Sequence, residues 1–317
     1  MTLERTFPAK PARRRLLFLA HRVPFPPDKG DRIRSLQMLT WLACRHDVWL
    51  GCLADEPWTP DTEAHLRQLC VEVKIAPLTR RRWLHGAASL LSGGPVTLGM
   101  FECAELRRWI RAVTARTPFD GVVVFCSNMA GYMRMRELRR LPLLVDLVDV
   151  DSAKWRDYAE RSTGLLRRLY RREARCLEAV ERDLGHRAHA ITLTTPVERE
   201  LYHKHAPGSP SYVVGNGVDI DFFHRPENCA PSAREVVFVG AMDYRPNVDG
   251  MLWFCRHVWP EVRARLPDAV LRIVGRRPTP AILALSPQPG ITIHADVPDV
   301  RQYLISARLA VVPLHVA

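Results

Sequence analysis

Short apolar segments that alternate with longer amphipathic ones constrain the fold of this chain more than any other feature of its sequence. Mainly apolar runs of three to six residues, typical of strands, occur at 16–20, 48–53, 71–75, 121–125, 143–148 and 190–193, and again at 236–239, 270–274, 291–293 and 309–312. Amphipathic stretches at 31–45, 60–69 and 248–265, and a long basic stretch that runs through Glu181, predict helices between them. Because strands covered on both faces carry nearly continuous apolar runs, the sequence predicts an α/β fold with doubly wound parallel sheets.

The pattern runs through two rounds, which suits a chain of 317 residues. A turn-rich segment at 206–210 separates them, so we expect an N-terminal Rossmann-like domain at 15–208 and a second Rossmann-like domain at 209–317. Residues 1–14 are rich in Pro, Arg and Lys without periodicity, which predicts a flexible leader. The second round holds few strands for a doubly wound sheet, and we expect that domain to be incomplete.

Charge is distributed unevenly along the chain. Residues 1–205 carry a net charge of +11, whereas residues 206–317 carry +1. A basic half suits nucleic acid, an anionic membrane or phosphorylated ligands. No nucleic-acid recognition motif accompanies the arginines, so we expect no nucleic-acid partner. Two segments, 80–91 and 165–172, combine Arg with Trp, Leu and Tyr as interfacial helices do, although amphipathic helices packed on the sheet have the same composition.

The sequence also bears on the location of the protein. The apolar run at 16–20 is too short for a signal peptide or a membrane span, and no later segment approaches 18 apolar residues. The eight cysteines form no Cys-x-x-Cys pair and no closely spaced pattern, which favours reduced thiols. We therefore expect a cytoplasmic protein, peripheral on the cytoplasmic face of the inner membrane.

Polar residues at the carboxyl ends of predicted strands are the candidate site residues, since open parallel sheets bind ligands there. Gly30 opens a helix after the first strand, where backbone N–H groups, with Lys29, Arg32 and Arg34, suit an anion. Asp149 and Asp151 follow the strand at 143–148, where carboxylates bind hydroxyls, act as a base or cap the next helix.

Several other chemistries are disfavoured. The acids at 146–151 have no His or Glu at ligand spacing, and the pairs His186/His189 and His203/His205 lack further ligands, so we expect no metal. The sequence contains no Gly-x4-Gly-Lys-Ser/Thr loop, no Gly-x-Gly-x-x-Gly after its first strand and no Gly-x-Ser-x-Gly elbow. ATPase, dinucleotide-binding and hydrolase functions are thereby weakened.

A series of motifs carries a family resemblance. They are HRVPFPPDKGDRIRS at 21–35, VDVDS at 148–152 with KW at 154–155, YRRE at 170–173, GNGVD at 215–219, GAMDY at 240–244 with PN at 246–247, IVGR at 273–276 and DVR at 299–301. On these motifs the chain resembles the GT-B sugar transferases of glycosyltransferase family 4, specifically the bacterial transferases associated with PEP-CTERM/exosortase exopolysaccharide systems. The resemblance implies two Rossmann-like domains that face each other across a cleft, the first for acceptor and the second for donor.

The resemblance also implies roles for particular residues. Donor-binding residues would be Lys29, Gly30 and Arg32 of the first domain with Gly240, Asn247, Gly275, Arg276, Asp296 and Val297 of the second. Acceptor-binding residues would be His21, Arg22, Arg34, Lys154 and Trp155. Many relatives carry a His after a mid-domain strand; here Ser127, Asp149 and Asp151 are the candidate catalytic residues, and none is singled out. A nucleotide-diphosphate sugar would be the co-substrate, with no cofactor and no metal.

The implied function is a retaining, hexosyltransferase-type reaction that moves a sugar to a lipid-linked or saccharide acceptor in exopolysaccharide or cell-surface glycan synthesis. The family's Gly-x-Gln-Asn-Lys-x-x-Glu-Ala segment, which holds a phosphate-binding Lys and a sugar-binding Glu, would follow residue 317. We therefore expect a C-terminally truncated transferase that is inactive in this form. Two alternatives stay open: a GT-B sugar-nucleotide epimerase, and a non-catalytic scaffold or binding fragment of a polysaccharide-synthesis complex.

Overall fold

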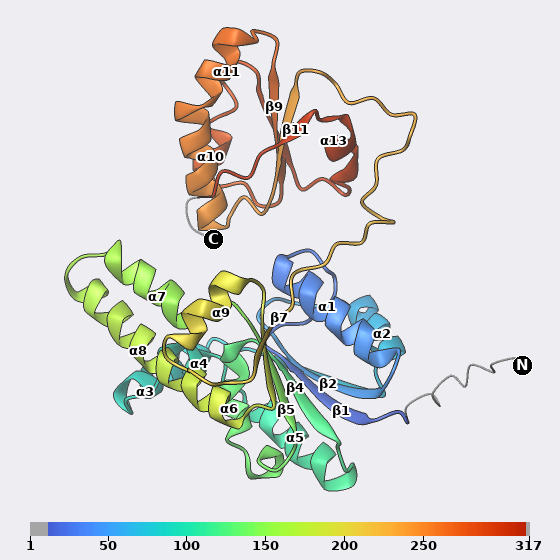
Figure 1. Cartoon of the computed structure of the whole chain (residues 1–317), viewed down its shortest axis with the longest axis vertical. Helices are drawn as coiled ribbons and strands as arrows, with labels where there is room; N and C mark the ends of the chain where they lie inside the picture. Colours follow the sequence, from blue (N-terminus) through green and yellow to red (C-terminus); the bar gives the residue numbers. More distant parts are fainter. Residues whose placement is uncertain (1–11, 315–317) are drawn as a thin grey trace, which may run out of the picture. The chain divides into compact units, whose positions relative to one another are not determined.

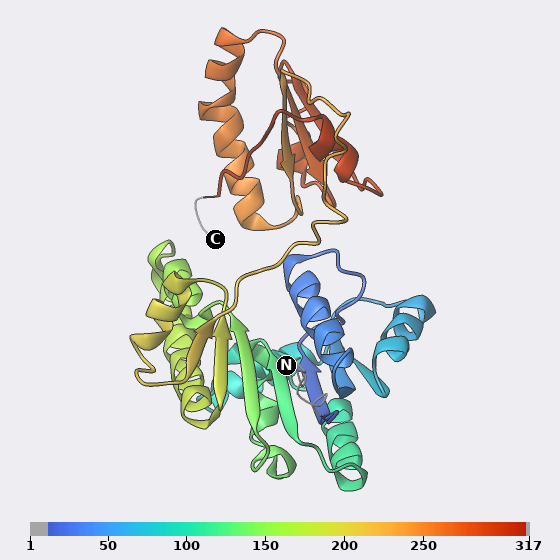
Figure 2. The same cartoon turned by 45° about the vertical axis from the view of Figure 1, so that its right-hand side comes forward.

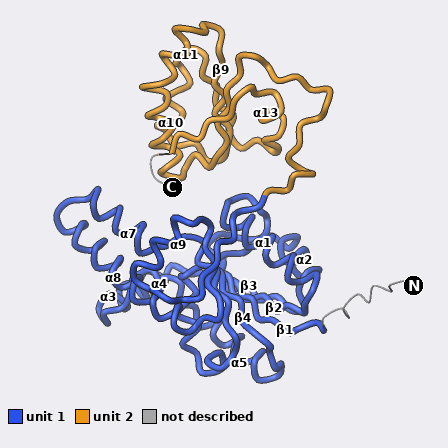
Figure 3. Tube along the Cα trace, viewed as in Figure 1, with its two compact units in different colours: residues 1–217 blue, residues 218–317 orange. Residues whose placement is uncertain are grey.

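The computed structural model describes residues 12–314, and the chain divides after Gly217 into two compact units (Figure 3). Residues 1–11 of the predicted leader, and the last three residues of the chain, lie outside the described residues. At the end of the leader, Arg13 forms an ion pair of 2.7 Å with Asp47 and donates to the carbonyl of Ala43 at 3.0 Å. This part of the predicted leader is therefore attached to the first unit.

The first unit is a seven-stranded parallel sheet in the order β3-β2-β1-β4-β5-β6-β7, covered by helices on both faces (Figure 1, Figure 2). Its strands are β1 (Arg15–Ala20), β2 (Asp47–Ala54), β3 (Glu72–Pro77), β4 (Gly121–Phe125), β5 (Leu143–Val148), β6 (Ala190–Leu193) and β7 (Ser211–Val213). Its α-helices are α1 (Gly30–Ala43), α2 (Pro60–Leu69), α3 (Arg82–Leu91), α4 (Val96–Met100), α5 (Ala104–Arg116), α6 (Ala130–Met133), α7 (Asp151–Glu160), α8 (Gly164–Arg187) and α9 (Pro196–His203), with 3-10 turns at Ser127–Met129 and Arg136–Leu138.

The apolar strands of this sheet are buried on both faces because successive side chains point to opposite sides. In β1, Leu17 and Leu19 join the core that includes side chains of α5 and α8, whereas Phe18 and Ala20 join the core that includes side chains of α1 and α2. All four residues are fully buried. The predicted strands of this domain are confirmed. Their continuous apolar runs, which made them recognisable, are buried on both faces of the sheet.

The second unit is a four-stranded parallel sheet in the order β10-β9-β8-β11. Its strands are β8 (Glu235–Val239), β9 (Val270–Gly275), β10 (Ile291–Ala295) and β11 (Leu309–Ala310), and its helices are α10 (Arg245–His257), α11 (Trp259–Arg265), α12 (Pro280–Leu283) and α13 (Arg301–Ser306). Phe238, Leu271 and Ile273 pack on one face beneath α10, and Val237 and Val274 pack on the other, toward α13.

Two predicted long helices are wrong in their continuity. The basic helix predicted through Glu181 is a hairpin of α7 and α8, because Gly164 takes a positive φ of 61° where the chain turns (Figure 1). The helix predicted at 248–265 is also two helices, α10 and α11, and Pro260 stands in the first turn of the second.

The boundary between the units also differs from the predicted one at 208/209. The short strand β7 pairs in parallel with β6, from Ile191 opposite Ser211 to Leu193 opposite Val213, and so extends the first sheet. Residues 209–217 therefore belong to the first unit.

Within residues 12–314, no helix combines the length and the apolar character that a membrane-spanning helix needs. In each sheet the chain reverses its direction of strand addition once, between β1 and β4 and between β8 and β11. The loops that follow these strands are where doubly wound sheets bind ligands.

Candidate functional site

His21 leaves β1 at the reversal point of the first sheet. Its imidazole is buried and stacks on Phe125, the last residue of β4, with ring centroids 5.8 Å apart and planes inclined by 13°. Its Nε2 lies 3.4 Å from Asp31 Oδ2, and among the described residues its buried Nδ1 has no hydrogen-bond partner. The ring is therefore held between Phe125 and Asp31 at the strand ends.

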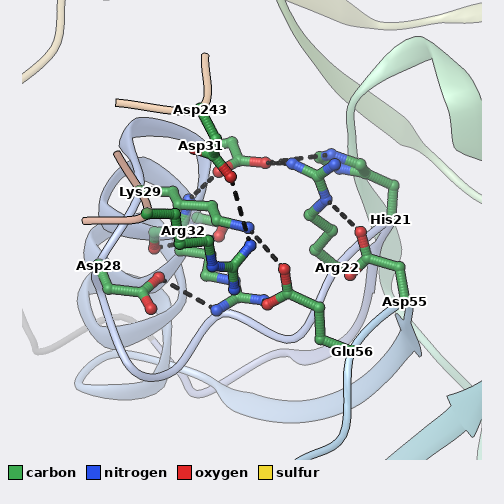
Figure 4. Close-up of polar contacts among 11 residues, drawn as sticks. His21, Arg22, Asp28, Lys29, Asp31, Arg32, Asp55, Glu56 and Asp243 are labelled. Carbon is green, nitrogen blue, oxygen red and sulfur yellow. Dashed lines mark hydrogen bonds and ion pairs between the residues drawn. The ribbon is translucent and has the colours of Figure 1, made fainter. Parts of the chain in front are cut away.

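Arg22 and Asp31 form the centre of an ion-pair network beside His21 (Figure 4). Arg22 donates to Asp31 Oδ2 at 2.6 Å and to Asp55 Oδ2, in the loop after β2, at 3.0 Å. Burial opposes the ionised form of Asp31, but hydrogen bonds and charge from His21 and Arg22 outweigh it and hold the pKa of this carboxyl well below its ordinary value. Arg22 is thus engaged by two carboxylates of its own chain.

The cations around Gly30 are engaged in the same way (Figure 4). Lys29 Nζ lies 2.8 Å from Glu56 Oε1, and Arg32 contacts Asp28 Oδ1 and Glu56 Oε2 at 3.0 Å each. The hydrogen bond from Lys29, with the charges of Lys29 and Arg32, lowers the pKa of Glu56 to about 2. The predicted anion-binding cations are therefore balanced by carboxylates, which the sequence-based argument did not include.

Arg34 is buried and hydrogen-bonded to residues of its own unit. Its guanidinium grips both carboxylate oxygens of the fully buried Asp146, at 2.7 and 3.1 Å, and donates to Gly215 O at 3.2 Å and Asn216 Oδ1 at 3.1 Å. Arg34 was one of the five residues predicted to bind acceptor. Its hydrogen bonds instead connect α1 to β5 and to the last residues before the second unit, which is a structural role.

Ser127 and Asp151 meet at the ends of β4 and β5. Ser127 is fully buried and its hydroxyl donates to Asp151 Oδ2, while Asp151 begins α7. Burial raises the pKa of Asp151 above its ordinary value, against the lowering effects of the Ser127 hydrogen bond and the charge of Lys154. Cys126, which precedes Ser127, and Val148, three residues before Asp151, take positive φ values of 78° and 68°, which non-glycine residues seldom adopt.

Two carboxylates, the buried Glu181 and the half-buried Glu198, hold the loop that carries Asp151. Glu181 of α8 accepts the backbone N–H of Ser152 at 3.0 Å and its hydroxyl at 2.5 Å. Glu198 of α9 accepts the N–H of Val150 at 2.6 Å, and burial raises the pKa of Glu198. Neither glutamate was predicted to act here, because both lie on helices more than 25 residues further along the chain.

The remaining predicted residues of the first unit are not part of this pair. Asp149 is exposed, and one of its oxygens accepts from the Thr194 hydroxyl at 3.1 Å. Trp155 packs between α7 and α8, with its ring centroid 5.2 Å from that of Tyr170. Lys154 is exposed on α7, one turn after Asp151.

In the second unit the glycines predicted to bind donor lie against each other. A Cβ on Gly275, at the end of β9, would stand 1.8 Å from the carbonyl oxygen of Gly240, just after β8. Asn247, in the first turn of α10, donates its side-chain amide to Ala241 O at 2.9 Å, and a Cβ on Gly240 would stand 2.8 Å from that nitrogen. Only glycine at 275 permits this approach, so bare backbone lines the carboxyl ends of these strands.

The other predicted donor-binding residues surround these strand ends. The carbonyl of Arg276 accepts from Met242 N at 2.9 Å, and Asp296 N donates to Gly275 O at 2.8 Å. Arg277 and Asp296 take positive φ values of 52° and 51°. Val297 is partly buried and packs against the core of Val237 and Val274, so its side chain contributes packing.

Within residues 12–314, no three His, Cys, Asp or Glu side chains are grouped as a metal site would require. The second histidine pair lies beside Ser211 and Glu181. His203 Nε2 contacts the Ser211 hydroxyl at 2.6 Å, and His205 Nε2 lies 2.9 Å from Glu181.

Comparisons with known proteins bear on both units. Residues 233–317 match the family model described as "Glycosyl transferases group 1". Among curated protein sequences, none matches this chain.

Solved structures resemble the whole chain at low identity. An alpha,alpha-trehalose-phosphate synthase (UDP-forming) from Burkholderia vietnamiensis is 10% identical with a TM-score of 0.54, covering 94% of this chain and 78% of that one. TarM is 7% identical with a TM-score of 0.57, covering 94% and 80%. Phytolacca americana UGT2, complexed with UDP-2fluoro-glucose and pterostilbene, is 11% identical with a TM-score of 0.51, covering 96% and 81%. The predicted GT-B fold, with two Rossmann-like units, is confirmed.

Proposed function

We propose that this protein is a retaining glycosyltransferase that moves a sugar from a nucleotide-diphosphate sugar to a lipid-linked or saccharide acceptor in exopolysaccharide or other cell-surface glycan synthesis. The observation that carries the proposal is the match of residues 233–317 to the group 1 glycosyl transferase model, over the strand ends at which Gly240 and Gly275 meet. The UDP-forming synthase and the UDP-2fluoro-glucose complex of the same fold support a nucleotide-sugar donor.

The donor would bind at the carboxyl ends of β8, β9 and β10. Breaking the bond between sugar and diphosphate builds negative charge on the leaving phosphate, and helix N-termini and arginines stabilise such charge. Here α10 begins five residues after Gly240, and among the described residues its N-cap Tyr244 makes no side-chain capping bond. We assign the diphosphate to this helix start and to Arg276, with no metal ion in the reaction.

The acceptor would bind at the carboxyl ends of β1, β4 and β5. A carboxylate with a raised pKa is a better proton acceptor than an ordinary one, so we assign Asp151 to take the proton of the acceptor hydroxyl. Ser127, fully buried, would orient that carboxylate, and His21, through its contact with Asp31, would hold the start of the loop after β1 in place. Asp149, which faces Thr194, would play no part in proton transfer.

We place the reaction on the cytoplasmic face of the inner membrane, at an anionic surface. The excess of basic residues in the first 205 residues, the acceptor half, supports this placement. The motifs between residues 21 and 301, which resemble those of exosortase-associated sugar transferases, support an exopolysaccharide as the product.

A panel of UDP-, GDP-, ADP- and dTDP-sugars tests the proposal in two steps. The first step measures binding by titration calorimetry and by thermal stabilisation; at 100 times its Kd a donor should stabilise the protein by about 2.7 kcal/mol. Arg276→Met should weaken binding at least about tenfold, the loss of one charged contact to phosphate. Arg265→Met, on α11 of the same unit, should leave it unchanged.

The second step measures release of the nucleoside diphosphate with and without a saccharide or polyprenyl-phosphate saccharide acceptor. Release that needs acceptor supports the transferase, whereas release without acceptor would support a sugar-nucleotide epimerase instead. Donor binding without any release would fit an inactive transferase and a binding component of a synthesis complex equally, and would overturn turnover by this protein. Absence of affinity for every donor of the panel would overturn the proposal.

A further inference from the structure

Helix α3 turns an apolar face toward solvent. Trp83, Leu84, Leu90 and Leu91 recur at the spacing of one helix face, and they are 62%, 68%, 37% and 89% exposed. The opposite face packs on α4, where Gly86 is buried and a Cβ on Gly99 would collide with the backbone of His85. An amphipathic helix ordinarily buries its apolar side. The exposed apolar face of α3 therefore marks a surface for contact with another apolar surface, such as a membrane.

The first turns of α8 expose leucines as well. Leu165 is 81% exposed, and Leu166 and Leu169 are 48% and 38% exposed. Leu165, Leu169, Arg172 and Cys176 follow one another at spacings of three and four, which places them on one face of the helix.

This face of α8 lies against the end of α3 (Figure 1). Arg172 donates to Leu90 O at 3.1 Å and to Gly94 O at 2.9 Å, and the thiol of Cys176 lies 3.7 Å from Gly93 O. The buried Glu173 accepts the N–H groups of Val96 and Thr97 at 2.9 and 2.8 Å. These bonds connect the middle of α8 to the end of α3 and to the loop that follows it. We call the exposed apolar residues of the two helices the α3–α8 surface; they are Trp83, Leu84, Leu90, Leu91, Leu165, Leu166 and Leu169.

The charge around this surface has one sign. Residues 73–101 and 161–172 contain no Asp or Glu. They contribute the arginines 80, 81, 82, 161, 167, 168, 171 and 172, and all of these except Arg82 and Arg172 are exposed. Leucine and tryptophan framed by arginine are the composition that binds an anionic lipid interface.

A pocket of about 520 Å³ beside the surface adds a site for a phosphate. It lies between the loop at 92–95 and α8, and Arg134, Arg172 and Arg175 contribute to its lining. Arg172 Nη1 is buried without a hydrogen bond among the described residues, and it stands 3.9 Å from Glu173 Oε2. Guanidinium groups bind phosphate oxygens through paired N–H donors, so this pocket suits a lipid headgroup.

We propose that the α3–α8 surface docks on an anionic phospholipid membrane, with its Trp and Leu side chains in the interface, its arginines on headgroup phosphates and one headgroup in the pocket of Arg134, Arg172 and Arg175. This inference rests on the membrane placement proposed above and does not depend on the sugar-transfer reaction.

Vesicle flotation with the full chain tests the docking. Vesicles of phosphatidylcholine with 30% phosphatidylglycerol should carry the protein upward at low salt, and phosphatidylcholine alone should carry much less. Leu84→Glu with Leu91→Glu should weaken binding about a hundredfold, since two leucines that docking would bury in the membrane interface are lost. Arg80→Glu with Arg81→Glu should weaken it at least about tenfold. The matched control is Leu266→Glu with Leu283→Glu, at positions 47% and 49% exposed in the second unit, which should bind as the wild type does.

Brominated lipids give a second readout at one residue. They should quench part of the tryptophan fluorescence, and Trp83→Phe should remove that part while leaving flotation nearly intact. Equal flotation with neutral and anionic vesicles, or full flotation of the Leu84→Glu, Leu91→Glu protein, would overturn the proposal. Because donor binding is measured without vesicles, a failure of docking and a failure of sugar transfer are distinguishable.

Discussion

At the scale of single residues, the buried pair of Arg34 and Asp146 should be the most sensitive ion pair described. The side chain of Arg34 is 7% exposed and that of Asp146 is fully buried. Removing one member leaves the other charge buried and alone, so Arg34→Met should lower the free energy of unfolding by about 3–5 kcal/mol in urea denaturation. Arg67→Met, which breaks the exposed pair with Glu63, should cost less than about 1 kcal/mol. Equal losses in the two variants would contradict the buried-pair argument.

Asp151 should make stability depend on pH in the opposite sense to most aspartates. Its pKa in the folded state is raised from 3.8, so folding binds a proton between pH 3.8 and the folded pKa, and the ionised carboxylate costs stability at every higher pH. Asp151→Asn keeps an acceptor for Ser127 without the charge. Its Tm should exceed that of the wild type at pH 7 and converge with it toward pH 3.8, in thermal scans across that range.

Two further results would complete the Asp151 experiment. Asp149→Asn, at the exposed neighbouring acid, should leave the Tm unchanged at each pH. If Asp151→Asn melts below the wild type at pH 7, the ionised carboxylate stabilises the fold and the assignment of a raised pKa is wrong.

The sequence predicted residue types at the strand ends better than it predicted their partners. It placed Lys29, Gly30 and Arg32 correctly after β1, since a parallel strand and the next helix dictate that loop. It did not predict that Glu56, from the loop after β2, lies against both cations. Ion pairs between the loops of different strands depend on which strands are neighbours in the sheet. The local sequence pattern does not reveal that order.

At the scale of elements, the contact between the ends of β8 and β9 limits what can replace glycine. Gly275→Ala would place a Cβ on the Gly240 carbonyl, so it should destabilise the second unit by about 1–3 kcal/mol or more. Gly30→Ala is the matched change, because a Cβ there meets no described atom within 4 Å, and it should alter stability by less than about 0.5 kcal/mol. Chemical denaturation of both variants decides this; a neutral Gly275→Ala would contradict the close approach.

Elements were predictable where burial is continuous and unpredictable where it is not. The strands at 121–125, 143–148 and 190–193 are predicted to the residue because each is a mainly apolar run whose side chains join the buried cores. By contrast β7 is three residues long, and Tyr212 and Val213 are 57% and 40% exposed. Such a strand has no apolar signature, and the predicted boundary at 208/209 consequently fell before it.

At the scale of the whole molecule, the two units have separate cores and should melt separately. Leu106 and Leu271 are fully buried, one in each core. Leu106→Ala should lower only the transition of the first unit, and Leu271→Ala only that of the second, by about 2–5 kcal/mol each. Differential scanning calorimetry of the full chain measures both, and a single transition that moves equally in the two variants would contradict independent cores.

The GT-B architecture was the most predictable property of the chain. Two rounds of strand and helix follow from hydrophobic patterning alone, and ordered motifs along almost the whole sequence add the family resemblance. Side-chain geometry was the least predictable: the Ser127–Asp151 pair joins residues 24 positions apart through strands that become neighbours only in the folded sheet.

Glu173 never meets solvent, yet it holds the start of α4 and with it the loop that joins α3 to the rest of the first unit. Replacing it with Gln would withdraw one of two acceptor oxygens from the N–H groups of Val96 and Thr97. The start of α4, and with it the position of α3, would then be held by fewer hydrogen bonds, although no exposed atom is changed. The docking proposed for the α3–α8 surface would thus depend on a residue inside the protein, at a position that surface mutagenesis alone would overlook.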